Sequence, residues 1–191
     1  MTLPTLSKDA WLNGLTVDTA SLHSGFPGAT GANELSGGGY AKQSVTFNPS
    51  SGGSRLLAAP VTFTKTAGDT VRWVGFWNSG VFRFAVPNGG ATPRNFMAVP
   101  SNDYVYSTGH GYSDNQKLAF FNGSPPGGLT EGTIYFVVSS DTERFKVAAT
   151  LGGTAIDLTS ASSFGCVVCA ITEDTGSGTH DLTAAQLTVP D

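Results

Sequence analysis

The two cysteines lie in one apolar run and are the first candidates for chemistry. Cys166 and Cys169 stand in the stretch Phe-Gly-Cys-Val-Val-Cys-Ala-Ile. A Cys-x-x-Cys pair is typical of zinc and redox sites, but a structural zinc ion needs two further ligands at suitable spacing. The β-branched residues predict a buried strand from Phe164 to Ile171, in which positions i and i+3 face opposite sides. We therefore expect two buried structural thiols, with neither a shared metal nor a disulfide.

The three histidines lie in separate segments. His23, His110 and His180 each stand beside Gly, Ser or Thr. A three-histidine metal site would need these side chains to converge, and nothing in their spacing requires it. We expect turn or surface roles for all three, and no metal ion or cofactor.

The nearest approach to an acid/base constellation is in the last twenty residues. Glu173-Asp174 and His180-Asp181 flank the glycines of Gly176-Ser177-Gly178. A solvated loop between strands accounts for the same pattern, and we favour that interpretation. Neither a Gly-x-Ser-x-Gly elbow nor a glycine-rich phosphate loop ending in Lys-Ser/Thr occurs. We therefore expect no catalytic residues and a protein that is not an enzyme.

Aromatic residues are dense between positions 73 and 84. Trp73, Phe76, Trp77, Phe82 and Phe84 occupy alternating positions of a predicted hairpin. Such residues usually form a core, although aromatic faces can also stack on sugars. A binding role would require exposed rings, and the candidate surface-binding residues are Trp73, Trp77 and Tyr112.

The chain is weakly charged. Charged residues make up 13% of its 191 residues, about half the usual share. Two explanations stay open: short strands with plentiful loops, or a surface covered by neighbouring subunits. The net charge is −4 and the ten Lys and Arg residues are scattered, so no basic face for nucleic acid is expected. The start lacks a secretory signal and no apolar run reaches membrane-helix length, which predicts a soluble protein without a membrane partner.

One helix is predicted, near the start. Ser7 is a candidate cap for a short helix over Lys8–Leu12 that ends near Gly14. Trp11, Leu12 and Leu15 would form its inner face.

The remaining signals are strands separated by turn residues. Gly25 to Gly39 contains glycines and Pro27, which favour an ordered corner. Asn78-Ser79-Gly80 predicts a tight hairpin, and the run 144–148 alternates with Phe145 and Val147 inward and Arg144 and Lys146 outward. The expected fold class is all-β: an antiparallel β-sandwich or barrel module with a short N-terminal helix, plus a second small β module.

Residues 87–93, Pro-Asn-Gly-Gly-Ala-Thr-Pro, mark the strongest boundary. We expect a first module over 1–90 and a second over 91–160, which could be an insertion. Residues 161–191 would then supply strands that complete the first sheet.

Two stretches resemble known phage proteins. Residues 11–47 contain Leu-His-Ser-Gly-Phe-Pro-Gly-Ala-Thr-Gly-Ala-Asn-Glu-Leu (22–35) and Gly-Gly-Tyr-Ala-Lys-Gln (38–43). They resemble the opening of a family of small tailed-bacteriophage structural proteins, the tail-fibre or minor tail proteins, and the match continues through 60–64 and 71–86. Residues 103–158 resemble a β module recurrent in phage virion proteins. The matching residues there are Thr-Gly-His-Gly (108–111), Leu-Thr-Glu-Gly-Thr-Ile-Tyr-Phe-Val-Val (129–138), Phe-Lys-Val-Ala (145–148) and Ala-Ile-Asp-Leu (155–158).

The resemblance implies a non-enzymatic assembly subunit of a tailed-phage virion, made in the host cytoplasm. It leaves open whether the subunit is tail-associated, as a minor tail or fibre protein, or decorates the head. The expected partners are further copies of the chain, with a trimer as first guess, and major capsid or tail proteins. A glycan- or receptor-binding adsorption module on the virion surface, contacting a host-surface glycan, is the alternative.

Overall fold

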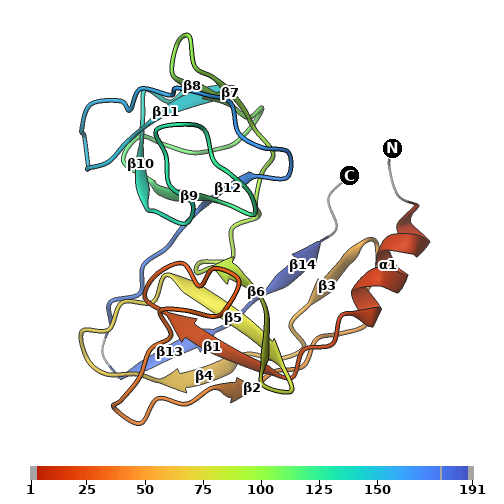
Figure 1. The fold of residues 1–191 in the computed structure, drawn as a ribbon. Helices are drawn as coiled ribbons and strands as arrows, with labels where there is room; N and C mark the ends of the chain where they lie inside the picture. Colours follow the sequence, from red (N-terminus) through yellow and green to blue (C-terminus); the bar gives the residue numbers. More distant parts are fainter. Residues whose placement is uncertain (1–3, 177, 189–191) are drawn as a thin grey trace. The chain divides into compact units, whose positions relative to one another are not determined.

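The chain folds as a mostly β protein with several antiparallel sheets and one short helix, as expected from the sequence. The computed structural model describes residues 4–176 and 178–188. The chain divides into two compact units (Figure 1). Unit 1 comprises residues 1–90 and 173–191, and unit 2 comprises residues 91–172.

Unit 1 is built on a four-stranded antiparallel sheet in the order β2-β1-β5-β6, with two two-stranded sheets, β13-β4 and β14-β3. Its elements are α1 (Thr5–Gly14), β1 (Thr19–His23), β2 (Gln43–Ser44), β3 (Ser54–Leu56), β4 (Val61–Thr64), β5 (Trp73–Asn78), β6 (Val81–Pro87), β13 (Thr179–Leu182) and β14 (Gln186–Thr188). Strands β13 and β14 lie in the segment 161–191 for which the sequence predicted strands, and residues 177 and 189–191 of that segment lie outside the described residues.

The hairpin between β5 and β6 is the tight one predicted from Asn-Ser-Gly. Asn78 pairs with Val81, so that Ser79 and Gly80 form a two-residue loop. Their φ angles are 50° and 78°. Positive φ at both positions is the type I′ geometry, whose twist matches that of the flanking strands.

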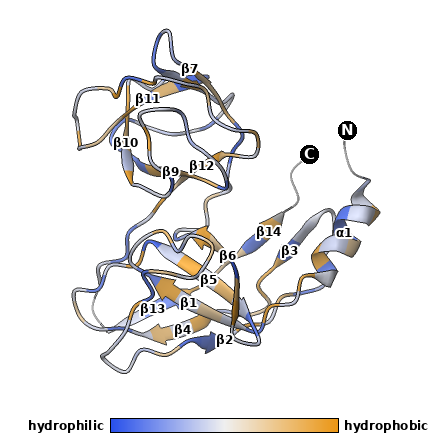
Figure 2. Ribbon diagram, viewed as in Figure 1, coloured by the Kyte–Doolittle hydropathy of each residue, from blue (hydrophilic) through white to orange (hydrophobic). Residues whose placement is uncertain are grey.

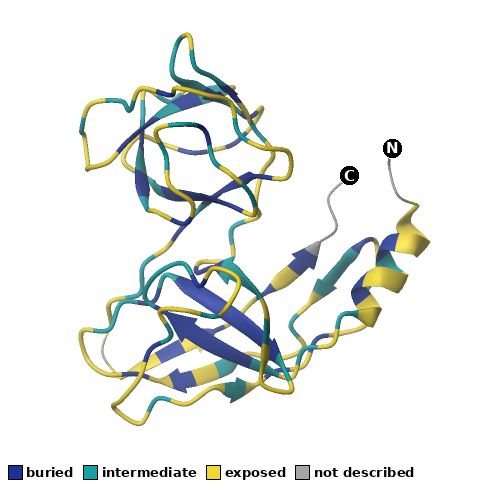
Figure 3. Cartoon of the chain, viewed as in Figure 1, coloured by how far each residue is buried: buried dark blue, intermediate teal, exposed yellow. Residues whose placement is uncertain are grey.

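Strands β1 and β5 are buried along nearly all of their lengths because both of their faces are covered (Figure 3). Both strands contain hydrophobic residues (Figure 2). On one face, apolar pairs such as Ala20–Phe76 and Leu22–Val74 join a core cluster that includes Phe63 of β4 and Leu182 of β13. On the other face stand Ser21, His23, Trp73, Gly75 and Trp77, which alternate with the first set.

The glycine-rich connection covers this second face and is ordered, as predicted. It is held by backbone hydrogen bonds, among them Ala32 N–H to Pro27 O and Leu35 N–H to Leu22 O. The ring of Phe26 packs edge-on against Trp73 at 5.0 Å. Gly31 has φ 78°, and a Cβ atom there would lie 2.6 Å from the Trp77 ring, so the close approach needs glycine.

Helix α1 places Leu12 in the core of unit 1, with Leu15 packed against it, as the sequence indicated, but it turns Trp11 outward. It begins at Thr5 after Pro4, and no side chain caps its start, so Ser7 is not the cap. Lys8 and Leu12 are buried, whereas Trp11 is 63% exposed. The prediction of an inner Trp11 was wrong because the helix is oriented by contacts four residues apart: the Lys8 stem lies against Gly53 and Leu12 enters the core.

Unit 2 is a six-stranded antiparallel sheet in the order β12-β9-β10-β11-β8-β7. Its strands are β7 (Met97–Val99), β8 (Tyr104–Tyr106), β9 (Lys117–Phe121), β10 (Tyr135–Val138), β11 (Arg144–Ala148) and β12 (Val167–Ala170). Arg94, just before β7, exchanges both backbone hydrogen bonds with Val168 of β12. The segment 94–99 thus pairs with β8 through β7 and with β12 through Arg94. This joins the two ends of the sheet and closes it into a small barrel.

The interior of the barrel is filled by alternating residues of its strands. Phe145 and Val147 point inward and Arg144 and Lys146 outward, as predicted for β11. The buried interior residues include Ala98, Val105, Leu118, Phe120, Tyr135, Val137, Phe145, Val147 and Val168.

The division into units differs from the expected one at its second boundary. The break near residue 90 coincides with the start of unit 2, but unit 2 extends to Thr172 and not to residue 160. The reason is β12, which pairs with β9 through Val167–Phe121 and three further pairs. The chain returns to unit 1 only with β13 and β14, which pair with β4 and β3 and not with the four-stranded sheet.

Candidate functional site

The three aromatic residues proposed as surface-binding candidates are buried. Trp73 is 0%, Tyr112 8% and Trp77 9% exposed. Trp73 and Trp77 lie under the 24–35 connection, and Tyr112 belongs to the barrel core, where its ring contacts Phe145 edge-on at 5.4 Å. The exposed flat faces that a binding role required are therefore absent at all three positions.

Trp77 is enclosed by polar as well as apolar neighbours. Its indole Nε1–H donates to Ser21 Oγ at 2.6 Å. The Lys42 ammonium lies 3.1 Å from the ring centroid, and the same lysine pairs with Glu34 at 3.3 Å. Phe82 packs edge-on against the indole at 5.0 Å. The arrangement holds the covering connection in place.

Ser21 and His23 form a pair with the composition of a nucleophile and its base. Ser21 Oγ lies 2.7 Å from His23 Nε2, and His23 Nδ1 lies 2.7 Å from Ala32 O. Because a carbonyl only accepts, Nδ1 carries the proton and Nε2 accepts from the serine hydroxyl. Both residues are 0% exposed, so no substrate reaches them. Burial lowers the pKa of His23, which favours the neutral imidazole.

The expectation of turn or surface roles was wrong for His23 and His180, which lie in β1 and β13 and are buried, whereas His110 lies in a turn, as expected, but is buried too. Each imidazole makes at least one specific hydrogen bond that makes burial tolerable. His110 Nδ1 accepts from Tyr112 N–H at 2.8 Å, and His180 Nδ1 lies 2.6 Å from Asp174 Oδ2. Nε2 of His110 and of His180 has no hydrogen-bond partner among the described residues.

The acidic residues near the end of the chain are distributed over three separate pairs. Glu173 accepts from Arg72 Nε at 2.6 Å, and Asp181 accepts from the Thr62 hydroxyl at 2.6 Å. Burial opposes ionisation of Asp174, but hydrogen bonds from His180 and the Gly176 amide outweigh it and lower the pKa of Asp174. Each group joins one segment of unit 1 to another, and Ser177 lies outside the described residues.

The cysteines are buried and free, as predicted. Cys166 stands in the barrel core just before β12, and the Cys169 thiol lies 3.3 Å from Ala91 O. Burial raises the pKa of Cys166 to about 11 and that of Cys169 to about 12. Both thiols stay protonated at neutral pH and are poor nucleophiles.

Residues 4–176 and 178–188 contain no candidate metal site and no candidate membrane span. No group of three or more His, Cys, Asp or Glu side chains there is placed to hold a metal ion. No helix in the same part of the chain has the length and apolar character that crossing a bilayer requires.

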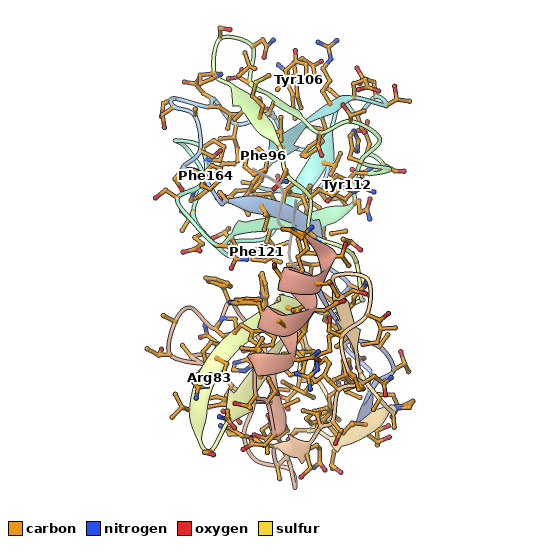
Figure 4. All side chains as sticks on the ribbon, turned by 90° about the vertical axis from the view of Figure 1, so that its right-hand side faces the viewer. Arg83, Phe96, Tyr106, Tyr112, Phe121 and Phe164 are labelled. Atoms are coloured by element: carbon orange, nitrogen blue, oxygen red, sulfur yellow. The ribbon has the colours of Figure 1, made fainter. Side chains whose placement is uncertain are left out.

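A cluster of aromatic and charged side chains stands on the outer face of β8 and β11 in unit 2. Arg144 pairs directly with Tyr106 across the two strands. The guanidinium carbon lies 4.3 Å from the Tyr104 ring centroid and 5.7 Å from that of Tyr106, and the Lys146 ammonium lies 4.8 Å from the Tyr104 ring. We call Tyr104, Tyr106, Arg144 and Lys146 the tyrosine–arginine face; Tyr106 is labelled in Figure 4, in the part of unit 2 that carries β8.

The tyrosine–arginine face is fixed by hydrogen bonds from the adjacent turns. Asp141 accepts from Arg144 Nε at 3.0 Å and from the backbone N–H of Glu143 and Arg144. Tyr106 Oη accepts from Arg144 Nη1 and from Asn102 Nδ2, both at 3.2 Å. These two bonds, that from Arg144 first, lower the pKa of Tyr106. The rotamers of Arg144 and Tyr106 are therefore set before any partner arrives.

The sequence held a signal for the tyrosine–arginine face that the aromatic count did not reveal. Tyr-Val-Tyr at 104–106 and Arg-Phe-Lys at 144–146 each place a buried residue between two outward ones. The pairing of the two strands brings the outward pairs together. The dense hairpin at 71–86 gave a stronger signal, but both faces of its sheet are covered.

Comparisons of the chain with protein-family models, with curated proteins and with solved structures gave no match.

Proposed function

We propose that the protein is a non-enzymatic structural subunit of a tailed-phage virion, either tail-associated, as a minor tail or fibre protein, or a head-decoration protein. The observation that carries the proposal is the role of the polar residues in the two stretches that resemble phage proteins. Those residues hold segments of the fold together, as a scaffold requires, and are not directed at a common open site.

In the first stretch, the polar residues attach the glycine-rich connection to the sheet. His23 bonds to Ala32 O, and Asn33 Nδ2 donates to Phe26 O at 2.8 Å. Tyr40 Oη accepts from the Leu22 backbone N–H at 2.9 Å and donates to Glu34 at 3.2 Å. Burial raises the pKa of Tyr40, so this hydroxyl keeps its proton.

In the second stretch, the Thr-Gly-His-Gly motif builds a corner of the barrel. Gly109 and Gly111 have φ of 61° and 69°. The Gly109 N–H donates to Thr142 O, and the His110 ring packs edge-on against Phe145 at 5.0 Å. The motif joins β8 to the turn before β11.

The proposed subunit acts as a homo-oligomer in contact with major capsid or tail proteins, with a trimer as the first expectation. Its low charge leaves few repulsive groups at a contact between copies, and closed symmetry is the usual arrangement of repeated subunits. Light scattering coupled to size-exclusion chromatography measures the state directly. A monomer at all concentrations would remove this part of the proposal.

Locating the protein on particles tests the central proposal. Purified particles are analysed by mass spectrometry and labelled with antibody for electron microscopy. We expect the chain among the particle proteins, with label on the head or on the tail. Absence from intact and from disrupted particles would refute the virion assignment.

The rival from another class is a cell-wall or glycan hydrolase. Incubation of the purified chain with host envelope material distinguishes the two, because a hydrolase releases sugar fragments and a structural subunit does not. Release that persists in a Ser21→Ala variant would point to a site outside the buried Ser21–His23 pair.

Adsorption to a host-surface glycan is a second candidate function, favoured by one observation. The tyrosine–arginine face presents preordered polar and aromatic groups on the outside of the barrel. Tyrosine and arginine are enriched among residues that dominate binding energies. Trp73, Trp77 and Tyr112 do not take part in this version.

A further inference from the structure

We infer that the tyrosine–arginine face binds an uncharged carbohydrate. This inference rests on the adsorption candidate above, narrows its ligand to an uncharged sugar, and assigns the hydrogen-bond donor to Tyr106. It does not depend on whether the protein belongs to the head or to the tail.

The hydroxyl of Tyr106 supplies an unused hydrogen-bond donor. A phenolic oxygen accepts through its lone pairs and donates one proton. Arg144 Nη1 and Asn102 Nδ2 both donate to this oxygen, so its own proton is available to solvent or to a ligand. No described residue accepts it. Because this oxygen accepts two hydrogen bonds, its own O–H is a good donor to an oxygen atom of a ligand bound on the tyrosine–arginine face.

The charges around the face cancel. Arg144 pairs with Asp141 at 3.0 Å and Lys146 with Asp103 at 3.9 Å. Two cations and two carboxylates give no net attraction for an anionic or cationic ligand. Planar carboxylate and guanidinium groups side by side do match a ligand that both donates and accepts, which is the property of sugar hydroxyls.

Apolar surface lies directly beside these polar groups. Met97 of β7 pairs with Tyr106 and is 60% exposed. The ring centroids of Tyr104 and Tyr106 are 6.1 Å apart, with 59° between the ring planes. The C–H faces of a sugar ring need such a surface next to the hydroxyl contacts, and the thioether of Met97 adapts to irregular shapes.

The competing explanation is that the tyrosine–arginine face only stabilises the outside of the barrel. Exposed cation–π pairs of this kind do contribute to stability. That explanation predicts that removing the hydroxyl of Tyr106 affects only stability. Tyr106→Phe therefore separates the two explanations, since it keeps the ring and removes the donor.

The test uses the full chain and saturation-transfer NMR with a defined panel. The probes are glucose, galactose, N-acetylglucosamine and rhamnose, short oligosaccharides of each, and galacturonic acid as the charged comparator. We expect saturable binding of at least one neutral sugar, and we expect this binding to be insensitive to added salt. Tyr106→Phe should weaken it at least about fivefold, the loss of one hydrogen bond.

The control variant is Phe164→Ser, at another exposed position of unit 2 (Figure 4), which should bind as the wild type does. Circular dichroism and melting temperature must show that both variants are folded. Four results would overturn the inference. The first three are no binding of any neutral sugar, unchanged sugar binding by Tyr106→Phe, and a salt-sensitive preference for galacturonic acid. The fourth is that a purified virion protein, and not a sugar, binds the wild type and fails to bind Tyr106→Phe.

Failure here and failure of the virion assignment give different results. A chain found on particles that binds no sugar refutes the carbohydrate inference alone. A chain that binds sugar through Tyr106 and is absent from particles refutes the virion assignment alone.

Discussion

Units 1 and 2 are both antiparallel β structures, but they shield their sheets in different ways. The open sheet of unit 1 leaves one face of β1 and β5 to be covered by the 24–35 connection. The sheet of unit 2 closes on itself through the pairing of Arg94 with Val168. Closure places one face of the strands inside, and on β8 and the first half of β11 it leaves the other face outward.

This difference decides where each unit keeps its aromatic and polar residues. In unit 1, four such residues lie between the sheet and the connection: Trp73, Trp77, Ser21 and His23. The hydrogen bonds among Ser21, His23 and Trp77 link β1 to β5. In unit 2, Tyr104, Tyr106 and Arg144 stand on the outside with their geometry already fixed. A closed barrel can therefore carry recognition on its strands, whereas a covered sheet cannot.

The largest effect is expected from Phe145→Ala. Phe145 is 0% exposed in the barrel interior, so truncation should cost about 3–5 kcal/mol and unfold unit 2 first. All three tryptophans, Trp11, Trp73 and Trp77, belong to unit 1. Tryptophan fluorescence should therefore keep its wild-type denaturation midpoint while methyl NMR signals of unit 2 are lost.

Phe164→Ala is the matched control, the same substitution at a fully exposed site, and should leave both transitions in place. A shift of the tryptophan transition by Phe145→Ala as large as that of unit 2 would contradict independent folding of the two units.

The second expected effect is confined to the covered face of unit 1. In Gly75→Ala the new Cβ would lie 2.4 Å from His23 Nε2 and 2.7 Å from Ser21 Oγ. Overpacking of this kind costs about 1–3 kcal/mol, measured as a lower midpoint of the tryptophan transition in urea. Gly14→Ala, where a Cβ meets nothing within 4 Å, should have little effect. Equal midpoints for the two variants would mean that the Ser21–His23 pair is not tightly enclosed.

The third effect is a dependence on pH that belongs to unit 1. Burial lowers the pKa of His23 below its ordinary value of 6.5, so below that pH the unfolded chain binds a proton that the folded chain does not. The stability of unit 1 should be complete above about pH 6.5 and fall as the pH is lowered. Melting followed by tryptophan fluorescence measures it, and His23→Gln should flatten this part of the profile. A wild-type profile that does not fall in this range would refute the assignment.

The smallest effect is expected at Trp11. Its exposed side chain on α1 should make Trp11→Ala cost no more than about 0.5 kcal/mol. Leu12→Ala, one residue further along the helix, should cost about 2–5 kcal/mol in the same urea titration because Leu12 is buried. A large loss from Trp11→Ala would restore the inner face that the sequence indicated.

Local patterns were sufficient to predict local structure. Asn-Ser-Gly at 78–80 specified its hairpin through residues that tolerate positive φ, and the alternation at 144–148 specified which side chains point inward. The apolar run around the cysteines indicated a buried strand and free thiols, although β12 covers only Val167–Ala170 of the predicted run and Phe164 is fully exposed. Each of these predictions depends on residues close together in the chain.

The sequence did not indicate which distant segment of the chain would cover or pair with each face of a strand. The burial of Trp73 and Trp77 depends on a connection that folds back from 24–35, and the burial of His180 on a hydrogen bond to Asp174. The tyrosine–arginine face needs β8 and β11 to pair across an intervening stretch of more than 35 residues. Pairings over such separations are set by the whole fold and leave no mark in a short window.

Unit 2 is inserted in the sequence of unit 1, between residues 90 and 173, and the two ends of unit 1 at this insertion are held close together. The chain leaves β6 with Asn88 N–H bonded to Arg72 O, and it returns with Asp174 bonded in both directions to Val71. Exit and re-entry are thus anchored on two consecutive residues, on the order of 10 Å apart at most. Any folded cassette whose own ends lie that close could be spliced between them without disturbing the strands of unit 1. The same scaffold can in this way carry barrels with different outer faces.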